Sequence, residues 1–197
     1  MDLLFYAMYF AALAVSTVLG TVLMNSRMDK RGFKFRKHIT VLIMLLTAAL
    51  LYLIGGFSLW TVKGTIMAFI LLYASVQDLS TREADDCLWV MLCILSLVNL
   101  RDVSIGSMLL GAAFVFVPQL IVAMFAKTGG IGGADIKLST AAALSLGFLR
   151  GAVGYMVGLI FAVVFQTVYN KIKGKSNKEA FPLLPFLSVG LMIGYLI

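Results

Sequence analysis

The chain has 197 residues, of which 61% are hydrophobic and 13% are charged, and its mean hydropathy is +1.02. This composition excludes a water-soluble globular domain and predicts an integral membrane protein. The formal net charge of +7 indicates basic loops at a membrane surface and attraction to anionic lipid, rather than binding of nucleic acid.

The apolar runs, taken in chain order, predict an all-α polytopic membrane protein with about eight transmembrane helices. An open sheet would leave backbone groups unsatisfied in lipid, and about 17–25 helical residues cross a bilayer core of about 30 Å. The predicted spans are 3–24, 39–59, 62–77, 87–100, 105–126, 137–149, 151–169 and 181–197. The first lacks a basic leading region, so we expect a mature helix rather than a signal peptide. Residues 1–197 are therefore expected to form a single transmembrane domain.

The distribution of Lys and Arg predicts that both termini lie outside the cell. Thirteen of the sixteen basic residues fall at Lys137 or in the loops 25–38, 78–86, 127–136 and 170–180. The opposite segments keep only Lys63, Arg101 and Arg150. Because basic loops stay on the cytoplasmic side, this asymmetry orients the chain in the cell membrane.

Two of the predicted cytoplasmic loops carry acidic residues at the edge of an apolar run. The loop DLSTREADD, residues 78–86, begins with Asp78, and the glycine-rich stretch KTGGIGGADIKL contains Asp135. Asp78 directly ends one apolar run and Asp135 begins another, so both are expected on helix termini at the same membrane face. The helices after them are predicted to be only about 20 Å long. Both carboxyl groups should therefore lie below the lipid surface, in a notch open to cytoplasmic water.

Two converging carboxyl groups predict a dyad that shares a proton, since like charges in contact cannot both ionise. One carboxylate can deprotonate a water molecule while the other carboxyl group protonates or polarises a peptide carbonyl. Nucleophilic catalysis has little support, because His38 is the only histidine available as a base. Cys87 and Cys93 form no C-x-x-C pair, so we expect no metal site and no cofactor.

These two segments resemble the type IV prepilin peptidases, membrane aspartic proteases with a G-x-G-D motif followed by a lysine two positions later. Gly132, Asp135 and Lys137 match that motif, and Ala134 replaces the second glycine. The family's first aspartate often has a basic residue four positions on and an L-P-D or I-P-N tripeptide ending eight positions on. Asp78, Arg82 and Asp86 match that pattern, whereas Ala84 and Asp85 replace the aliphatic residue and the proline.

A third segment near the carboxyl end, FPLLPFLSVG, resembles the family's P-F-G-P-F-L-x-x-G stretch. Its matching residues are Pro182, Pro185, Phe186, Leu187 and Gly190. The connection between the first two predicted helices has no room for the methyltransferase domain of larger members. The resemblance therefore implies a short, peptidase-only member.

The resemblance implies an aspartic endopeptidase that removes the short basic leader of a prepilin-like protein at the cytoplasmic membrane face. Asp78 and Asp135 would be catalytic. The residues expected to bind substrate or support the site are Gly132, Gly133, Ala134, Lys137, Arg82 and Asp86. The glycines either let the enzyme backbone approach an extended substrate or simply break a helix. Lys137 either orients Asp135 or extends to the interface, and Arg82 either supports the site or pairs with Asp86 or Glu83.

Two other functions are compatible with these residues. A small proton-coupled transporter would use the two aspartates as a proton relay, although such acids usually lie near the bilayer midplane. A prepilin-binding homologue without activity is suggested by Ala134. Elsewhere, the spacings Gly106–Gly111 and Gly151–Gly154–Gly158 predict close helix contacts. No oligomeric state is predicted.

Overall fold

The computed structural model describes residues 2–33, 36–98, 103–125, 132–173 and 181–197. In these residues every regular element is an α-helix, which confirms the all-α prediction. The helices in chain order are α1 (Asp2–Lys30), α2 (Lys37–Gly55), α3 (Leu59–Thr81), α4 (Asp86–Ser96), α5 (Ile105–Phe125), α6 (Gly133–Leu146), α7 (Phe148–Lys173) and α8 (Leu184–Leu196).

The helices fall into two length classes. Five of them, α1, α2, α3, α5 and α7, are long and apolar enough to cross a membrane. The other three have only 11 (α4), 14 (α6) and 13 (α8) residues. At about 1.5 Å per residue, α4 is only about 16 Å long. The predicted span 87–100 is longer than the helix, which ends at Ser96. It stays a prediction that each of these helices crosses the membrane. The side of the membrane that each terminus faces also stays a prediction.

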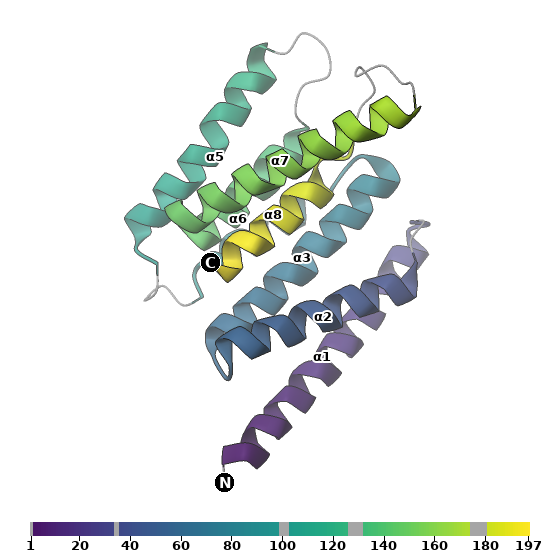
Figure 1. Ribbon diagram of the computed structural model, residues 1–197, viewed down its shortest axis with the longest axis vertical. Helices are drawn as coiled ribbons and strands as arrows, with labels where there is room; N and C mark the ends of the chain where they lie inside the picture. The colour runs from purple at the N-terminus through teal and green to yellow at the C-terminus, as the bar shows by residue number, and fades with distance from the viewer. Residues whose placement is uncertain (1, 34–35, 99–102, 126–131, 174–180) are drawn as a thin grey trace.

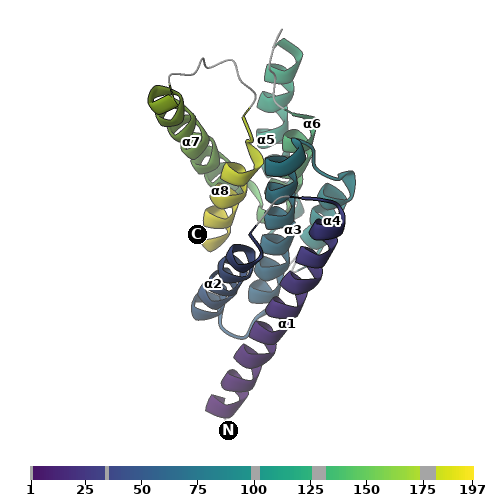
Figure 2. The same cartoon turned by 90° about the vertical axis from the view of Figure 1, so that its right-hand side faces the viewer.

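Helix α3 lies between the other helices of the elongated molecule (Figure 1). The α1–α2 pair covers one side of it, and α4 to α8 pack together on the other. The main apolar core lies between α3, α4, α6, α7 and α8, with fully buried side chains such as Met67, Leu92 and Leu187. Helices α5 and α7 diverge toward the end at which α6 begins (Figure 2). Helices α3, α6 and α8 thus supply most of the interior, whereas α4 buries only one face.

Helices α6 and α7 are joined by the single residue Gly147. Its φ of +80° is a conformation that favours glycine, and a Cβ there would lie 2.6 Å from Val103 Cγ1. The connection is fixed by a hydrogen bond from the Phe148 backbone N–H to Ser107 Oγ, at 2.9 Å. This glycine ends α6 earlier than the predicted boundary at residue 149.

Helices α7 and α8 pack at backbone contact through glycines. A Cβ at Gly190 would lie 2.3 Å from the backbone nitrogen of Gly158, and one at Gly154 would lie 2.9 Å from the carbonyl oxygen of Gly190. The predicted close contacts of the α7 glycines are thus confirmed. The prediction for Gly106 is wrong, because a Cβ there would meet nothing within 4 Å, whereas Gly111 does contact the next helix connection.

Lys63 holds the far ends of two short helices. The sequence places it among the few basic residues of the outer segments, but its side chain is 5% exposed. Its Nζ donates hydrogen bonds to the carbonyl oxygens of Val98, just beyond α4, and Ser145, in the last turn of α6, each at 3.1 Å. Carbonyls at helix ends have no partner within the helix. The lysine therefore satisfies two of them from the neighbouring α3.

We expect Lys63→Met to lower the free energy of unfolding by about 1–3 kcal/mol, because the buried carbonyl of Ser145 and the partly buried carbonyl of Val98 lose their donor. Methionine keeps most of the length of the side chain, so the loss of stability measures the contribution of the ammonium group. Thermal unfolding in detergent micelles measures the effect. Lys37→Met, at a half-exposed lysine, is the control, and equal unfolding temperatures for the two variants would contradict the expectation.

Candidate active site

Asp78 lies in the last turn of α3 and is 7% exposed. Helix α3 extends beyond the predicted boundary at residue 77 to Thr81, so Asp78 belongs to the last turn of the helix rather than to the loop after it. Its Oδ2 accepts a hydrogen bond from the backbone N–H of Leu184, the first residue of α8, at 3.2 Å. A carboxylate at the amino end of a helix is favoured by the free N–H groups there. The carboxyl group is thus oriented by α8.

Asp135 lies in the first turn of α6 and is partly exposed. Its Oδ2 accepts a hydrogen bond from the backbone N–H of Gly132, the residue before the helix, at 3.2 Å. A Cβ at Gly132 would lie 3.0 Å from the same oxygen, so a larger residue there would shift the carboxylate by a few tenths of an ångström. The glycine thus lets the carboxyl group fold back over the start of its own helix.

The two carboxyl groups come together from α3 and α6, close enough for the charge of Asp78 to act on Asp135. The charge of Asp135 also acts on Tyr155, a buried side chain of α7. The sequence places both aspartates at one membrane face. In the structure one acid is in the last turn of its helix and the other in the first turn of its own.

The backbone of Asp135 is held by a polar contact with α5 that the sequence did not suggest. Ser139 Oγ donates to the carbonyl oxygen of Asp135 at 2.6 Å, and Gln119 Nε2 donates to Ser139 Oγ at 2.8 Å. Gln119 is 1% exposed and follows Pro118 within α5. An amide residue within an apolar helix is the sequence signal that could have indicated this contact, because buried polar groups are kept where they find partners.

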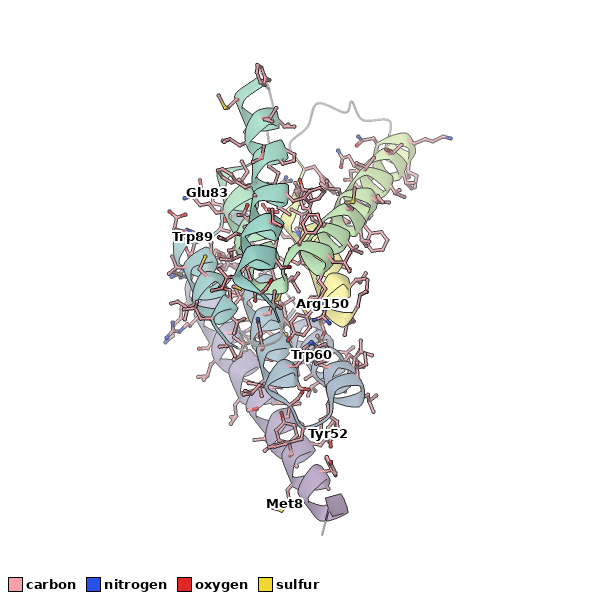
Figure 3. The ribbon with its side chains drawn as sticks, turned by 90° about the vertical axis from the view of Figure 1, so that its left-hand side faces the viewer. Met8, Tyr52, Trp60, Glu83, Trp89 and Arg150 are labelled. Carbon is pink, nitrogen blue, oxygen red and sulfur yellow. The ribbon has the colours of Figure 1, made fainter. Side chains whose placement is uncertain are left out.

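The charged residues predicted to support the site are placed at its edge. Lys137 Nζ pairs with Asp86 Oδ1 at 2.6 Å and so joins the start of α6 to the start of α4. Asp86 was one of the two partners expected for Arg82, and in the structure it pairs with Lys137. Arg82 ends α3 with φ +61°, and its charge acts on Asp78. Glu83 is exposed and lies at this end of α3, whereas Trp60 lies toward the other (Figure 3).

The remaining residues of the glycine motif are helical. Gly133 and Ala134 form the start of α6, and a Cβ at Gly133 would meet nothing within 4 Å. Neither has a positive φ, since the described residues with positive φ are Arg82, Gly32, Gly56 and Gly147. Alanine therefore fits at position 134 without backbone strain. Of the two described glycines of this motif, Gly132 is the one at which an added Cβ would approach the carboxyl group of Asp135.

The carboxyl-terminal proline segment is also part of the site. Pro185 stands in the first turn of α8, where its missing N–H costs nothing, and the N–H of Leu184 before it donates to Asp78. Ser188 extends the contact, because its hydroxyl forms a 2.9 Å hydrogen bond with Ser75 on α3. The segment that carries the third resemblance thus lies beside Asp78 in space.

Comparison with known proteins finds a family match over more than half of the chain. The model of the type IV leader peptidase family matches residues 65–170, a segment that contains both aspartates and ends before α8. No match to the chain occurs among curated proteins or among solved structures.

Proposed function

The chain belongs to the type IV leader peptidase family, and we propose that it removes the short basic leader of a prepilin-like protein as an aspartic endopeptidase. The family and the apolar helices together indicate a multi-pass membrane peptidase. The observation that supports the aspartic mechanism is the convergence of Asp78 and Asp135 from two helices, each carboxyl group oriented by a backbone N–H.

The proposed reaction needs only these two groups and a water molecule. The ionised member of the dyad takes a proton from water, and the resulting hydroxide adds to the scissile carbonyl carbon. The protonated member donates a hydrogen bond and then a proton to the carbonyl oxygen. Collapse of the tetrahedral intermediate breaks the C–N bond as the amine takes a proton from one carboxyl group, while a hydroxyl group of the intermediate returns its proton to the other carboxylate. The dyad thereby returns to its starting protonation.

The positions of the aspartates favour a peptidase over a proton-coupled transporter. A relay through the membrane would place acids near the middle of broken helices. Asp78 is instead in the last turn of α3 and Asp135 in the first turn of α6. Both groups thus lie at one end of their helices, where a leader on the cytoplasmic side would reach them.

Cleavage of a native prepilin tests this function directly. The purified protein, reconstituted in liposomes with candidate prepilins from its own organism, should shorten one of them at the amino end by its leader. Mass spectrometry of the product locates the cut. If no native candidate is shortened while the reconstituted protein remains folded, the peptidase proposal fails and the reading as a binding homologue gains support.

Ala134→Gly tests whether the departure from the family motif limits activity. Because residue 134 is helical with no positive φ, we expect cleavage within about threefold of wild type. Glycine is about 1 kcal/mol less favourable than alanine in a helix, so a slightly lower unfolding temperature should accompany it. A large gain in cleavage rate would instead show that alanine impairs the site and would favour an inactive homologue.

A further inference from the structure

Two consecutive residues at the start of α4 contact the two helices that carry the proposed catalytic aspartates. Asp85, the residue before α4, contacts α3, and Asp86, its first residue, contacts α6. Both contacts are made next to an aspartate of the dyad. Helix α4 therefore connects the two halves of the site.

The contact with α3 is made by Gln77, the residue directly before Asp78. Its side chain is 2% exposed, and both ends of its amide bind Asp85. Nε2 donates to Asp85 Oδ2 at 2.8 Å, and Oε1 accepts from the Asp85 backbone N–H at 3.1 Å. A buried amide whose two ends bind one residue fixes the position of that residue.

Asp85 has a further partner in Arg31, just beyond α1, whose guanidinium donates to the same carboxylate oxygen. Burial raises the pKa of Asp85, but the hydrogen bonds from Gln77 and Arg31 outweigh it and leave the pKa below its usual value. The group is therefore ionised at neutral pH. Because the folded-state pKa is lowered, these contacts stabilise the fold above about pH 4 and are lost only as the pH falls through the lowered value.

Asp85 stands where the family pattern has a proline. Its φ of −61° suits either residue, but proline has no N–H and no carboxylate. The two bonds to Gln77 therefore depend on the aspartate of this chain. They replace the rigidity of a proline ring with side-chain contacts.

The contact with α6 is the 2.6 Å ion pair between Asp86 and Lys137, two residues after Asp135. Both side chains are about half or more exposed, so the pair contributes little to global stability. Its effect is local, since it joins the first turns of α4 and α6.

We call these four residues the α4 bracket: Gln77, Asp85, Asp86 and Lys137. We propose that the α4 bracket sets the separation of the two catalytic carboxyl groups, an inference that rests on the proposed function. The four act as positioning residues, because none of them needs to touch the substrate. A dyad that shares a proton works only within hydrogen-bond reach, and a displacement of about 1 Å can cost about 100-fold in rate.

Kinetics of bracket variants give the first test. Gln77→Leu and Lys137→Met should each lower kcat by about tenfold or more, with KM within about threefold. The exchanged pair, Asp86→Lys with Lys137→Asp, should recover most of the lost kcat. Asp29→Asn is the matched control, because it removes the comparably exposed pair with Lys37 and should leave kcat unchanged. Unchanged kcat in both bracket variants, or no recovery in the exchanged pair, would overturn the proposal.

A second measurement does not depend on cleavage. Asp78→Cys and Asp135→Cys are combined with Cys87→Ser and Cys93→Ser, and bis-thiol cross-linkers of graded length measure the separation of the two positions. The intact bracket should favour one length, and adding Lys137→Met should spread the yield over several. An identical yield profile with and without that change would reject the bracket. If the cysteine variants show a changed profile while the protein that keeps Asp78 and Asp135 cleaves no prepilin, the peptidase function is rejected and the bracket is retained.

Discussion

Asp78→Asn and Asp135→Asn are each expected to abolish leader removal, with a loss in kcat of at least about 10²–10⁴. Asparagine cannot accept the proton of the attacking water or donate one to the scissile carbonyl oxygen. It does keep the size of the side chain and an oxygen that accepts a hydrogen bond. The bonds from the N–H groups of Leu184 and Gly132 can therefore persist, and the loss reports chemistry rather than folding. Product formation in liposomes, followed by mass spectrometry, measures the change.

The control for these variants is again Asp29→Asn, a neutralised carboxylate far from the dyad in sequence, which should cleave like wild type. Thermal unfolding should place both dyad variants near the wild-type midpoint. The two losses should not be additive in the double variant, because the dyad acts as a unit. Cleavage that persists in either single variant would remove the two-carboxylate mechanism, even if the chain is a peptidase.

The sequence predicts well those features that depend on local pattern. Hydropathy located each helix of the described residues, and the positions of Asp78 and Asp135 at the edges of apolar runs indicated that both lie at helix ends. The boundaries differ, since α3 extends to Thr81 and α6 begins at Gly133. The backbone hydrogen bonds of a helix continue into polar residues, and hydropathy does not detect these terminal turns, the last of α3 and the first of α6.

Local sequence patterns did not predict the contacts between segments that are distant in the chain. The bond from Leu184 to Asp78 joins residues 106 positions apart, and Lys63 reaches Ser145 across 82. In the sequence, Lys63 counts only among the basic residues of the outer segments, because basic residues near helix ends usually mark topology. Its burial depends on the short α4 and α6, whose ends stop beside it. The carboxyl-terminal proline motif pointed toward the site only through family resemblance.

Gly190→Ala should destabilise the protein and slow cleavage together. A Cβ at this position would lie 2.3 Å from Gly158 N and 2.4 Å from Gly154 O, so α7 and α8 must move apart. Overpacking of this kind costs about 1–3 kcal/mol, more than the small gain that alanine brings to a helix. Since α8 also donates its first N–H to Asp78, a displaced α8 should disturb the orientation of that carboxyl group.

Gly106→Ala is the matched control, because a Cβ there meets nothing within 4 Å and alanine favours a helix. It should unfold at the wild-type temperature or slightly above it and cleave normally. Unfolding temperatures in detergent and cleavage rates in liposomes, measured on both variants, separate packing from helix propensity. A Gly190→Ala protein as stable and active as the Gly106→Ala protein would show that the α7–α8 contact is not needed to hold α8 against the dyad.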